Sequence, residues 1–347
     1  MIKLKSLKGL NLQLLIILSL AYLTGCSAVS ESKLYRKGND YEKKQMYDEA
    51  IVVYSRVIQI NPDLISIYYK RYFSRHFPPV YMKGKFDQAL LDDIKTTSTD
   101  PAKLGAYYRR AFCYEKKGEL DKAISDYGKV IEIVPHDPNV YFMRAIDYIQ
   151  KNDFDQVISD CNKAIEINSH LAGVYGLRAF AYYKKGNFDQ AISDSNKAIE
   201  INPNFEKAYG CRALAYQKKG SLDQAISDYS KVLELNPKDG ITYSNRGFAY
   251  FKKSNLDQAI SDYNKAIEIN LNLAVAYYNR GLAYYRTEQY DNALADYKKA
   301  IILRPDDKEA YEEFINSVPA KTPSDTTDIR KEILQLFKEK MDLTEKK

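Results

Sequence analysis

Cysteine and histidine are the residues of this 347-residue chain that could hold a metal or act as nucleophiles, and both are sparse. The four cysteines are Cys26, Cys113, Cys161 and Cys211, and the three histidines are His76, His136 and His170. The last three cysteines are an odd number at unrelated positions, which favours buried thiols over a disulfide framework. Their scatter fits no zinc spacing, and the sequence has no glycine loop for phosphate. We therefore expect no metal, no cofactor and no enzyme activity.

Arginine and aspartate recur together along the chain, which indicates a different kind of chemistry. The seven expected pairs are Arg71 with Asp92, Arg110 with Asp126, Arg144 with Asp160, Arg178 with Asp194, Arg212 with Asp228, Arg246 with Asp262, and Arg280 with Asp296. An earlier copy of the same pattern lacks both members and has Lys37 and Val53. Joint presence and joint absence predict structural ion pairs, because a buried charge left alone is costly. An arginine ladder that binds a ligand is the alternative.

The elements that must position these charges repeat every 34 residues. Copies begin at Glu31, Ile65, Leu104, Pro138, Ala172, Glu206, Gly240 and Ala274. With the first residue of each copy as position 1, position 17 is large and apolar, position 20 is small in seven copies, and position 32 is Pro in six. The apolar positions fall at helical spacing in two runs, so each copy is predicted to be a pair of short amphipathic helices.

Two further positions describe how the helices begin and end. Position 15 is Gly or Asn in five copies, as in Gly186 and Asn152, which suits a left-handed helix end. Position 18 is Asp in all eight copies, as in Asp223. We expect these aspartates to cap the second helix of each pair, where a carboxylate also favours the helix dipole.

The pattern over Glu31 to Asp307 resembles the tetratricopeptide repeat, a helix pair with small and aromatic residues at these positions followed by Pro. The resemblance implies an all-α, right-handed superhelical solenoid of eight helix-pair repeats with a capping helix after the last one. The repeats are then residues 31–64, 65–103, 104–137, 138–171, 172–205, 206–239, 240–273 and 274–307. The third of these boundaries follows an excess of five residues around Pro78 and Pro79, which predicts a broken helix and a loop in the second repeat.

In the resembled family the first helices line the inner wall of the solenoid through positions 2, 5, 9 and 12, with position 13 at its edge. The residues predicted to line a protein-binding groove are Tyr108, Phe112, Phe142, Ile146, Phe180, Tyr183, Leu214, Phe248, Phe251, Tyr278, Leu282 and Tyr285. Lys and Arg at position 13 give this groove a basic rim, and Gly176 and Gly210 leave space in it. The alternative is that these aromatic residues pack between neighbouring helices as core. Asparagine at position 6 occurs only in Asn245 and Asn279, so the Lys/Asn clamp of chaperone-binding members is not reproduced.

Residues 1–25 are of another kind, with three lysines before an apolar run from Leu10 to Leu23 and no acidic residue. This layout is typical of a secretory signal, and the run is shorter than the ~20 residues of a membrane span. The sequence 23–26, LTGC, resembles the lipobox of bacterial lipoproteins, which implies cleavage after residue 25, acylation of Cys26 and a tether of residues 26–30. Ser27 resembles the residue after the cysteine in lipoproteins of the outer membrane, so we expect the bilayer as one partner.

Loss of the three leader lysines would lower the formal net charge from +6 to +3, and no basic stripe typical of nucleic-acid binding is present. After the last repeat, residues 308–318 are predicted to form a capping helix, 319–327 a linker and 328–341 an amphipathic helix. This terminal helix either caps the stack or lies in a groove, of its own or a neighbouring molecule, and competes with partners.

Taken together, the sequence predicts a lipid-anchored, periplasm-facing adaptor that binds other proteins or peptides. It resembles outer-membrane repeat lipoproteins that recruit envelope proteases, cell-wall hydrolases or assembly machines. The alternative is a structural lipoprotein subunit of an envelope secretion or pilus assembly complex. The sequence leaves the oligomeric state open.

Overall fold

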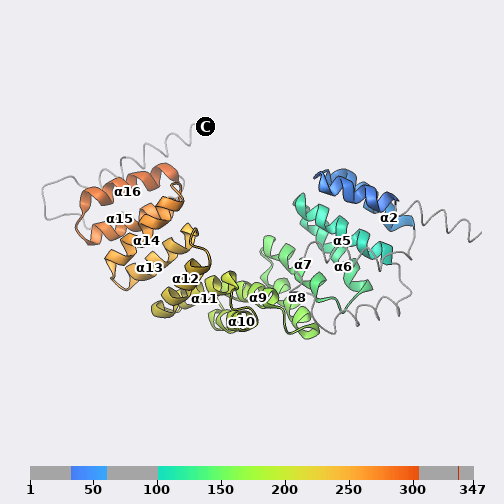
Figure 1. The fold of residues 1–347 in the computed structure, drawn as a ribbon, viewed down its shortest axis with the longest axis horizontal. Coiled ribbons are helices and arrows are strands. Elements are labelled where there is room, and N and C mark those ends of the chain that lie inside the picture. Colours follow the sequence, from blue (N-terminus) through green and yellow to red (C-terminus); the bar gives the residue numbers. More distant parts are fainter. Residues whose placement is uncertain (1–32, 61–100, 305–334, 336–347) are drawn as a thin grey trace, which may run out of the picture. The chain divides into compact units, whose positions relative to one another are not determined.

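The computed structural model describes residues 33–60, 101–304 and residue 335. All regular secondary structure in these ranges is α-helical, so the predicted all-α helix-pair fold is confirmed (Figure 1). The chain divides into two compact parts, Met1–Ala181 and Tyr182–Lys347, which are called here the N-terminal part and the C-terminal part. The handedness of the predicted superhelix stays a prediction.

The described helices come in pairs that follow the predicted repeats. In the N-terminal part a helix over residues 33–43 precedes α2 (Tyr47–Ile60), α5 (Pro101–Lys116), α6 (Leu120–Ile133), α7 (Pro138–Gln150), α8 (Phe154–Ile167) and α9 (Ala172–Lys184), whose end crosses into the second part. The C-terminal part continues with α10 (Phe188–Ile201), α11 (Glu206–Lys218), α12 (Leu222–Leu235), α13 (Gly240–Lys252), α14 (Leu256–Ile269), α15 (Ala274–Arg286) and α16 (Tyr290–Leu303). The two helices of a pair pack on each other, as α5 and α6, α7 and α8, α11 and α12, α13 and α14, and α15 and α16 do. The second helix of a pair packs on the next first helix, as α6 does on α7, α10 on α11, α12 on α13 and α14 on α15.

The turn inside each pair contains one residue with positive φ at position 15. Gly118, Gly186 and Gly220 have φ of +74°, +81° and +78°, as expected for a left-handed helix end. Ser254 and Glu288 adopt φ of 60° and 59° at the equivalent place, although an L side chain is disfavoured there. The turn geometry is therefore set by the packing of the two helices, and Gly only makes it less strained.

The core of most pairs is a tyrosine of the second helix packed on a small residue of the first. Tyr263 and Tyr297 are almost fully buried, and a Cβ placed on Gly247 or Gly281 would lie only 2.9 Å and 2.6 Å from their rings. A larger residue at position 8 would push these rings aside, because real Cβ contacts are longer. Positions 8 and 24 thus fix how closely the two helices of a repeat approach.

Arginine at position 7 ties three helices together. Arg212 of α11 donates from Nε and Nη2 to both carboxylate oxygens of Asp228 on α12, at 2.8 Å and 2.7 Å, and from Nη1 to Asn196 on α10 at 2.6 Å. In the same arrangement, Arg246 donates hydrogen bonds to Asp262 and Ser230. Arg280 donates to Asp296 and Asn264. In the N-terminal part, Arg110 donates hydrogen bonds to Asp126 and Ser55, and Arg144 donates to Asp160. The carboxylate contact therefore lies within one repeat. The third contact reaches the preceding repeat for Arg212, Arg246 and Arg280, and the first repeat for Arg110.

Burial of these arginine–aspartate pairs has a desolvation cost, because it removes their charges from water. Burial raises the pKa of Asp126 and of Asp160, although the hydrogen bonds from their arginine partners lower it. The pKa of Arg212 is raised by its hydrogen bonds to Asp228, so the guanidinium stays charged. The remaining expected pairs stay predictions, since Arg71 and Asp92 lie outside the described residues and Arg178 and Asp194 belong to different parts.

The aspartates at position 18 make a contact that the sequence did not predict. Asp223 is the second residue of α12, whose N-cap is Ser221, and its carboxylate forms an ion pair with Lys253 of the following repeat. Asp189 pairs with Lys219, and Asp121 with Lys151, in the same way. Asp121, Asp189 and Asp223 lie in the first turn of the second helix, where a carboxylate favours the helix dipole as expected. The expectation that they cap the helix was wrong, because their side chains reach across the repeat boundary instead of back to their own helix.

The first repeat contacts a repeat that is not its neighbour in the sequence. α5 packs on α2, Lys117 forms an ion pair with Asp48, and Arg110 Nη1 donates to Ser55 Oγ at 3.1 Å. These are the contacts that successive repeats make elsewhere, so repeat 104–137 stacks directly on residues 33–60. The predicted repeat 65–103 lies almost wholly outside the described residues, as do residues 1–30 and the helices predicted at 308–318 and 328–341.

Gly128 provides a test of the interrepeat contact, because it occupies the position at which other repeats offer Ser or Asn to the arginine. Arg144 Nη1 lies 3.9 Å from the place of a Cβ on Gly128. Gly128→Ala should stabilise α6 by up to ~1 kcal/mol. Gly128→Ser should stabilise it more than Ala does, because a hydrogen bond to the charged guanidinium outweighs the lower helix propensity of Ser. Urea unfolding would measure both, with Ser230→Ala as the matched loss of the same contact to Arg246. A Gly128→Ser chain less stable than Gly128→Ala would contradict the proposed contact.

Candidate functional site

The twelve residues predicted to line a groove divide into two groups. Tyr108 and Phe251 are buried, at 2% and 6% exposure, and the Tyr108 hydroxyl donates to Asp137 at 3.1 Å. Tyr108 and Phe251 therefore belong to the core, which corrects their assignment to the protein-binding groove. The half-buried group is Phe112, Phe142, Ile146, Phe180, Tyr183, Leu214, Phe248, Tyr278, Leu282 and Tyr285.

Half-buried residues of the first helices are held in place by neighbouring rings. Tyr278 packs on Tyr297 with ring centroids 6.1 Å apart, and Tyr285 lies edge-on to Tyr290 at 5.5 Å. Phe248 stacks near Phe251 at 6.4 Å, with an angle of 21° between the rings. Each residue thus gives part of its surface to the core and leaves the rest accessible.

Cations at position 13 lie over these rings. Lys252 Nζ is 5.2 Å from the centroid of Phe248, and the guanidinium of Arg286 is 4.3 Å from that of Phe251 in the preceding repeat. Lys116 covers Phe112 in the N-terminal part at 4.9 Å. A cation over an aromatic face is stabilised by the ring electrons, and its N–H groups remain open to another acceptor.

Two apolar residues at position 2 are exposed at the other end of the same helices. Ile241 of α13 is 62% exposed and Val275 of α15 is 46% exposed. Residues at positions 2, 5, 9 and 12 share one face of an α-helix, so Ile241 lies on the face of Phe248. The surface formed by positions 2, 5, 9, 12 and 13 of α11, α13 and α15 is called here the first-helix face. On α13 and α15 this face has an exposed apolar residue at one end and a cation at the other, whereas α11 has the exposed Lys207 at position 2 and Lys218 at position 13.

The first helices of the N-terminal part contain acidic residues, with Glu115 at position 12 of α5 and Asp147 at position 10 of α7. Asp147 of α7 is fully buried, and neither of its carboxylate oxygens has a hydrogen-bond partner among the described residues. Burial, and then the neighbouring Glu115, raise the pKa of Asp147 to about 7, against a smaller lowering by Lys116. Lys116 itself forms an ion pair with Glu115 at 3.3 Å.

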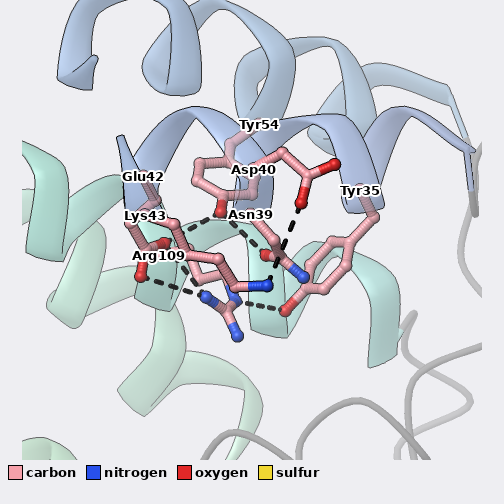
Figure 2. Close-up of polar contacts among 7 residues, drawn as sticks. All are labelled: Tyr35, Asn39, Asp40, Glu42, Lys43, Tyr54 and Arg109. Carbon is pink, nitrogen blue, oxygen red and sulfur yellow. Dashed lines mark hydrogen bonds and ion pairs between the residues drawn. The ribbon is translucent and has the colours of Figure 1, made fainter. Parts of the chain in front are cut away.

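A buried polar network joins the first repeat to α5 (Figure 2). Arg109 donates from Nε to the Tyr35 hydroxyl at 2.7 Å and from Nη1 to Glu42 at 3.0 Å and 3.2 Å. The Tyr54 hydroxyl lies 2.9 Å from Glu42 Oε2 and from Asn39 Oδ1, and it can donate to one of them. Every group that Arg109 contacts in this network belongs to the first repeat, so the arginine fixes α5 on that repeat.

Sequence analysis missed both Arg109 and Asp147, although each departs from its column of the repeat. Position 6 holds Met143, Leu177 and Cys211 in the three repeats that follow Arg109. Position 10 is Cys113 or Ala in the other repeats from residue 104 onward, where Asp147 introduces a carboxylate. From residue 104 onward each is the one charged residue in its column, and that was the signal that could have found them, although position 6 is also basic in the first two repeats, as Arg36 and Lys70.

Other chemistry is limited in the described part of the chain. Cys113, Cys161 and Cys211 are buried, as predicted, and none of them is in a disulfide bond. Burial raises the pKa of the Cys113 thiol to about 12. Within residues 33–60 and 101–304 no group of three metal-binding side chains occurs. No helix in these ranges has the length and apolar character needed to span a bilayer.

Two sequence models of one family match the chain. The model described as "Tetratricopeptide repeat" matches residues 33–64, 105–137, 206–239 and 274–307, and the model described as "TPR repeat" matches residues 179–220 and 249–288. The chain therefore belongs to the tetratricopeptide repeat family, which confirms the resemblance seen in the sequence. Tetratricopeptide repeats are generally non-enzymatic scaffolds suited to binding other proteins or peptides.

Solved structures show the same fold at low identity. A tetratricopeptide repeat protein from Parabacteroides merdae is 17% identical, with 89% of this chain and 99% of that chain covered and a TM-score of 0.57. PilF from Pseudomonas aeruginosa is 17% identical, with coverage of 68% and 100% and a TM-score of 0.55. Cut9–Hcn1, an APC/C hetero-tetramer, is 17% identical, with coverage of 84% and 57% and a TM-score of 0.55. No curated protein matches the chain.

Asp147 yields a stability prediction with a defined sign. Its folded-state pKa of about 7 lies above the ordinary value of ~3.9, so between these pH values the folded chain keeps a proton that the unfolded chain releases. Raising the pH through this window should therefore destabilise the wild-type chain. Asp147→Ala, the residue found at 181, 215, 249 and 283, should raise stability by ~1–3 kcal/mol at pH 8 and by much less at pH 4.

Urea unfolding at both pH values would measure this difference, with Asp147→Asn as the uncharged variant of the same shape. Asp121→Asn removes an exposed carboxylate of the same part and serves as the control. A gain for Asp147→Ala that is equal at pH 4 and pH 8 would contradict the buried, titrating carboxyl.

Proposed function

We propose that this chain is an adaptor that binds other proteins or peptides through the first-helix face of its C-terminal part. The observation that carries the proposal is the exposure of Ile241 and Val275 at equivalent places in consecutive repeats. Exposed apolar residues in a contiguous row favour a protein-binding site, and half-buried aromatic residues such as Phe248 are common anchors in such sites. Family membership supports the same kind of activity.

The face supplies the features that a binding site for an extended chain needs. α11, α13 and α15 present the same positions at regular intervals, so a partner can make the same contact several times. Because the rings of Phe248 and Tyr278 are held by neighbours, little side-chain entropy is lost when a partner covers them. Rigid aromatic residues beside adaptable cations favour recognition over catalysis.

Binding through this face predicts a specific loss on mutation. Ile241→Asp combined with Val275→Asp should abolish capture of partner proteins from detergent-solubilised envelopes, because both residues are exposed and the fold does not need them. Ile302→Asp changes an equally exposed apolar residue of the second helix α16 and should leave capture unchanged. Cross-linking and mass spectrometry of the captured proteins would measure this. Equal capture by all three chains would contradict the proposal, and one complex at fixed stoichiometry that survives both changes would indicate a structural subunit.

The lipid anchor and the periplasm-facing location are part of the same proposal. The support is in the sequence, where a charged and then apolar leader ends in LTGC at residues 23–26. Acylation of Cys26 would hold the first repeat close to a bilayer, since four residues separate Cys26 from Glu31. Bacterial lipoproteins of this kind carry several acyl chains, and each buried methylene contributes ~0.8 kcal/mol to membrane binding.

Cys26→Ser should abolish incorporation of labelled fatty acid and leave the leader attached, because the modified thiol is what the lipoprotein peptidase recognises. Metabolic labelling followed by gel electrophoresis would measure both effects, with Cys113→Ser as the control for an unrelated cysteine. A wild-type chain that takes up no labelled fatty acid would sink this part of the proposal.

A further inference from the structure

Neighbouring basic residues of the C-terminal part differ in what they bind. Lys219 and Lys253, at position 14, form ion pairs with Asp189 and Asp223 of the preceding repeats. Lys218 and Lys252, one residue earlier at position 13, are exposed and have no carboxylate partner among the described residues. Lys218 and Lys252 therefore remain available to bind a ligand, whereas the charges of Lys219 and Lys253 are neutralised by their aspartate partners.

Arg286 continues this row in the following repeat. It too is exposed, and its guanidinium lies over the ring of Phe251, 4.3 Å from the centroid, which leaves its N–H groups available at the ring edge. Lys252 Nζ lies over Phe248 in the same way. Lys218, Lys252 and Arg286 thus form a row of three open cations, one in each consecutive repeat, beside an apolar surface.

The first-helix face does not contain a charge that could balance this row. α11, α13 and α15 have one acidic residue between them, Glu206, at the opposite end of α11. Its Oε1 accepts a hydrogen bond from Asn236 at 3.3 Å. Clustered charges of one sign on a surface raise the local concentration of ligands of the opposite sign. The N-terminal part is unlike this, since Lys116 at the same position is paired with Glu115.

The spacing of the row restricts the shape of the ligand. First helices of adjacent repeats pack side by side, as α13 and α15 do, and packed helices lie roughly 8–10 Å apart. A polyproline-type or similarly extended peptide advances ~9 Å in three residues and presents every third side chain on one side. A carboxylate at every third residue would therefore meet Lys218, Lys252 and Arg286 in turn.

We propose that the first-helix face of the C-terminal part binds an extended acidic segment of a partner protein, with carboxylates about three residues apart on the row Lys218, Lys252 and Arg286. Apolar side chains of the same segment lie on the opposite edge, against Ile241 and Val275. This inference rests on the proposed function, because it names the chemistry of the partner at the same face. It adds that the negative charge of the partner segment, and the spacing of its carboxylates, determine which partner binds.

Selection from a displayed library of random twelve-residue peptides tests this with the full-length chain in detergent. The wild-type chain should enrich peptides with Asp or Glu at every third residue. The triple variant Lys218→Gln, Lys252→Gln, Arg286→Gln should lose this enrichment and bind the selected peptides at least ~10-fold more weakly, as measured by fluorescence anisotropy. The control Lys219→Gln, Lys253→Gln removes two charges from the next residues and should change affinity less than ~3-fold. Added salt should weaken the wild-type complex more than that of the triple variant.

The other outcomes are distinguishable. Enrichment of apolar peptides without acidic residues, equal for the wild-type chain and the triple variant, would overturn this inference and leave the protein-binding function intact. A selection that enriches no peptide for any chain would overturn the inference together with the proposed function. Co-sedimentation with phosphatidylglycerol vesicles that is lost in the triple variant, again without acidic peptides, would assign the row to a membrane surface and would equally overturn the inference.

Discussion

The stacking of the repeats depends on arginines held between three helices, as Arg110, Arg212, Arg246 and Arg280 are. Arg212 of α11 donates two hydrogen bonds to the carboxylate of Asp228 on α12 and a third to Asn196 on α10. The planar guanidinium matches a carboxylate in this two-pronged geometry, which a lysine cannot do. Because both groups are largely buried, neither can be left alone, and the orientation of one helix pair fixes that of the next. The first-helix face has regular spacing for this reason.

Departures from the repeated columns show where the chain does something other than repeat. Arg109 is the one charged residue at position 6 from residue 104 onward, and it binds Tyr35 and Glu42, so that α5 rests on the first repeat although about forty residues separate α2 from α5. A buried ion pair of this kind contributes specificity of pairing more than stability. Asp147 replaces an alanine or cysteine and lacks a hydrogen-bond partner among the described residues, which costs stability that an alanine would restore. The open cations at position 13 follow a regular column, by contrast, and so belong to the general design of the face.

The periodicity of the sequence was enough to predict the helix pairs and the partners of Arg212, Arg246 and Arg280, because both depend on spacing within one repeat. It could not separate core from surface within one helix face: Phe248 and Phe251 are three residues apart, yet only Phe251 is buried, under the guanidinium of Arg286 from the next repeat. The ion pair between Asp223 and Lys253 was also missed, since it joins different repeats and the aspartate alone looked like a helix cap. The contact of α5 with α2 depends on a long-range choice between alternative stacks, which a local pattern does not encode.

The most direct test of this account is a double-mutant cycle on Arg212 and Asp228, measured by urea unfolding. Each single change to Ala should cost ~3–5 kcal/mol, because it leaves a largely buried charge without its partner. The double variant should cost less than the sum of the two by at least ~1 kcal/mol. Costs that add within ~0.3 kcal/mol would show that the two residues do not interact, and would contradict the claim that the arginine forks hold the repeats in register.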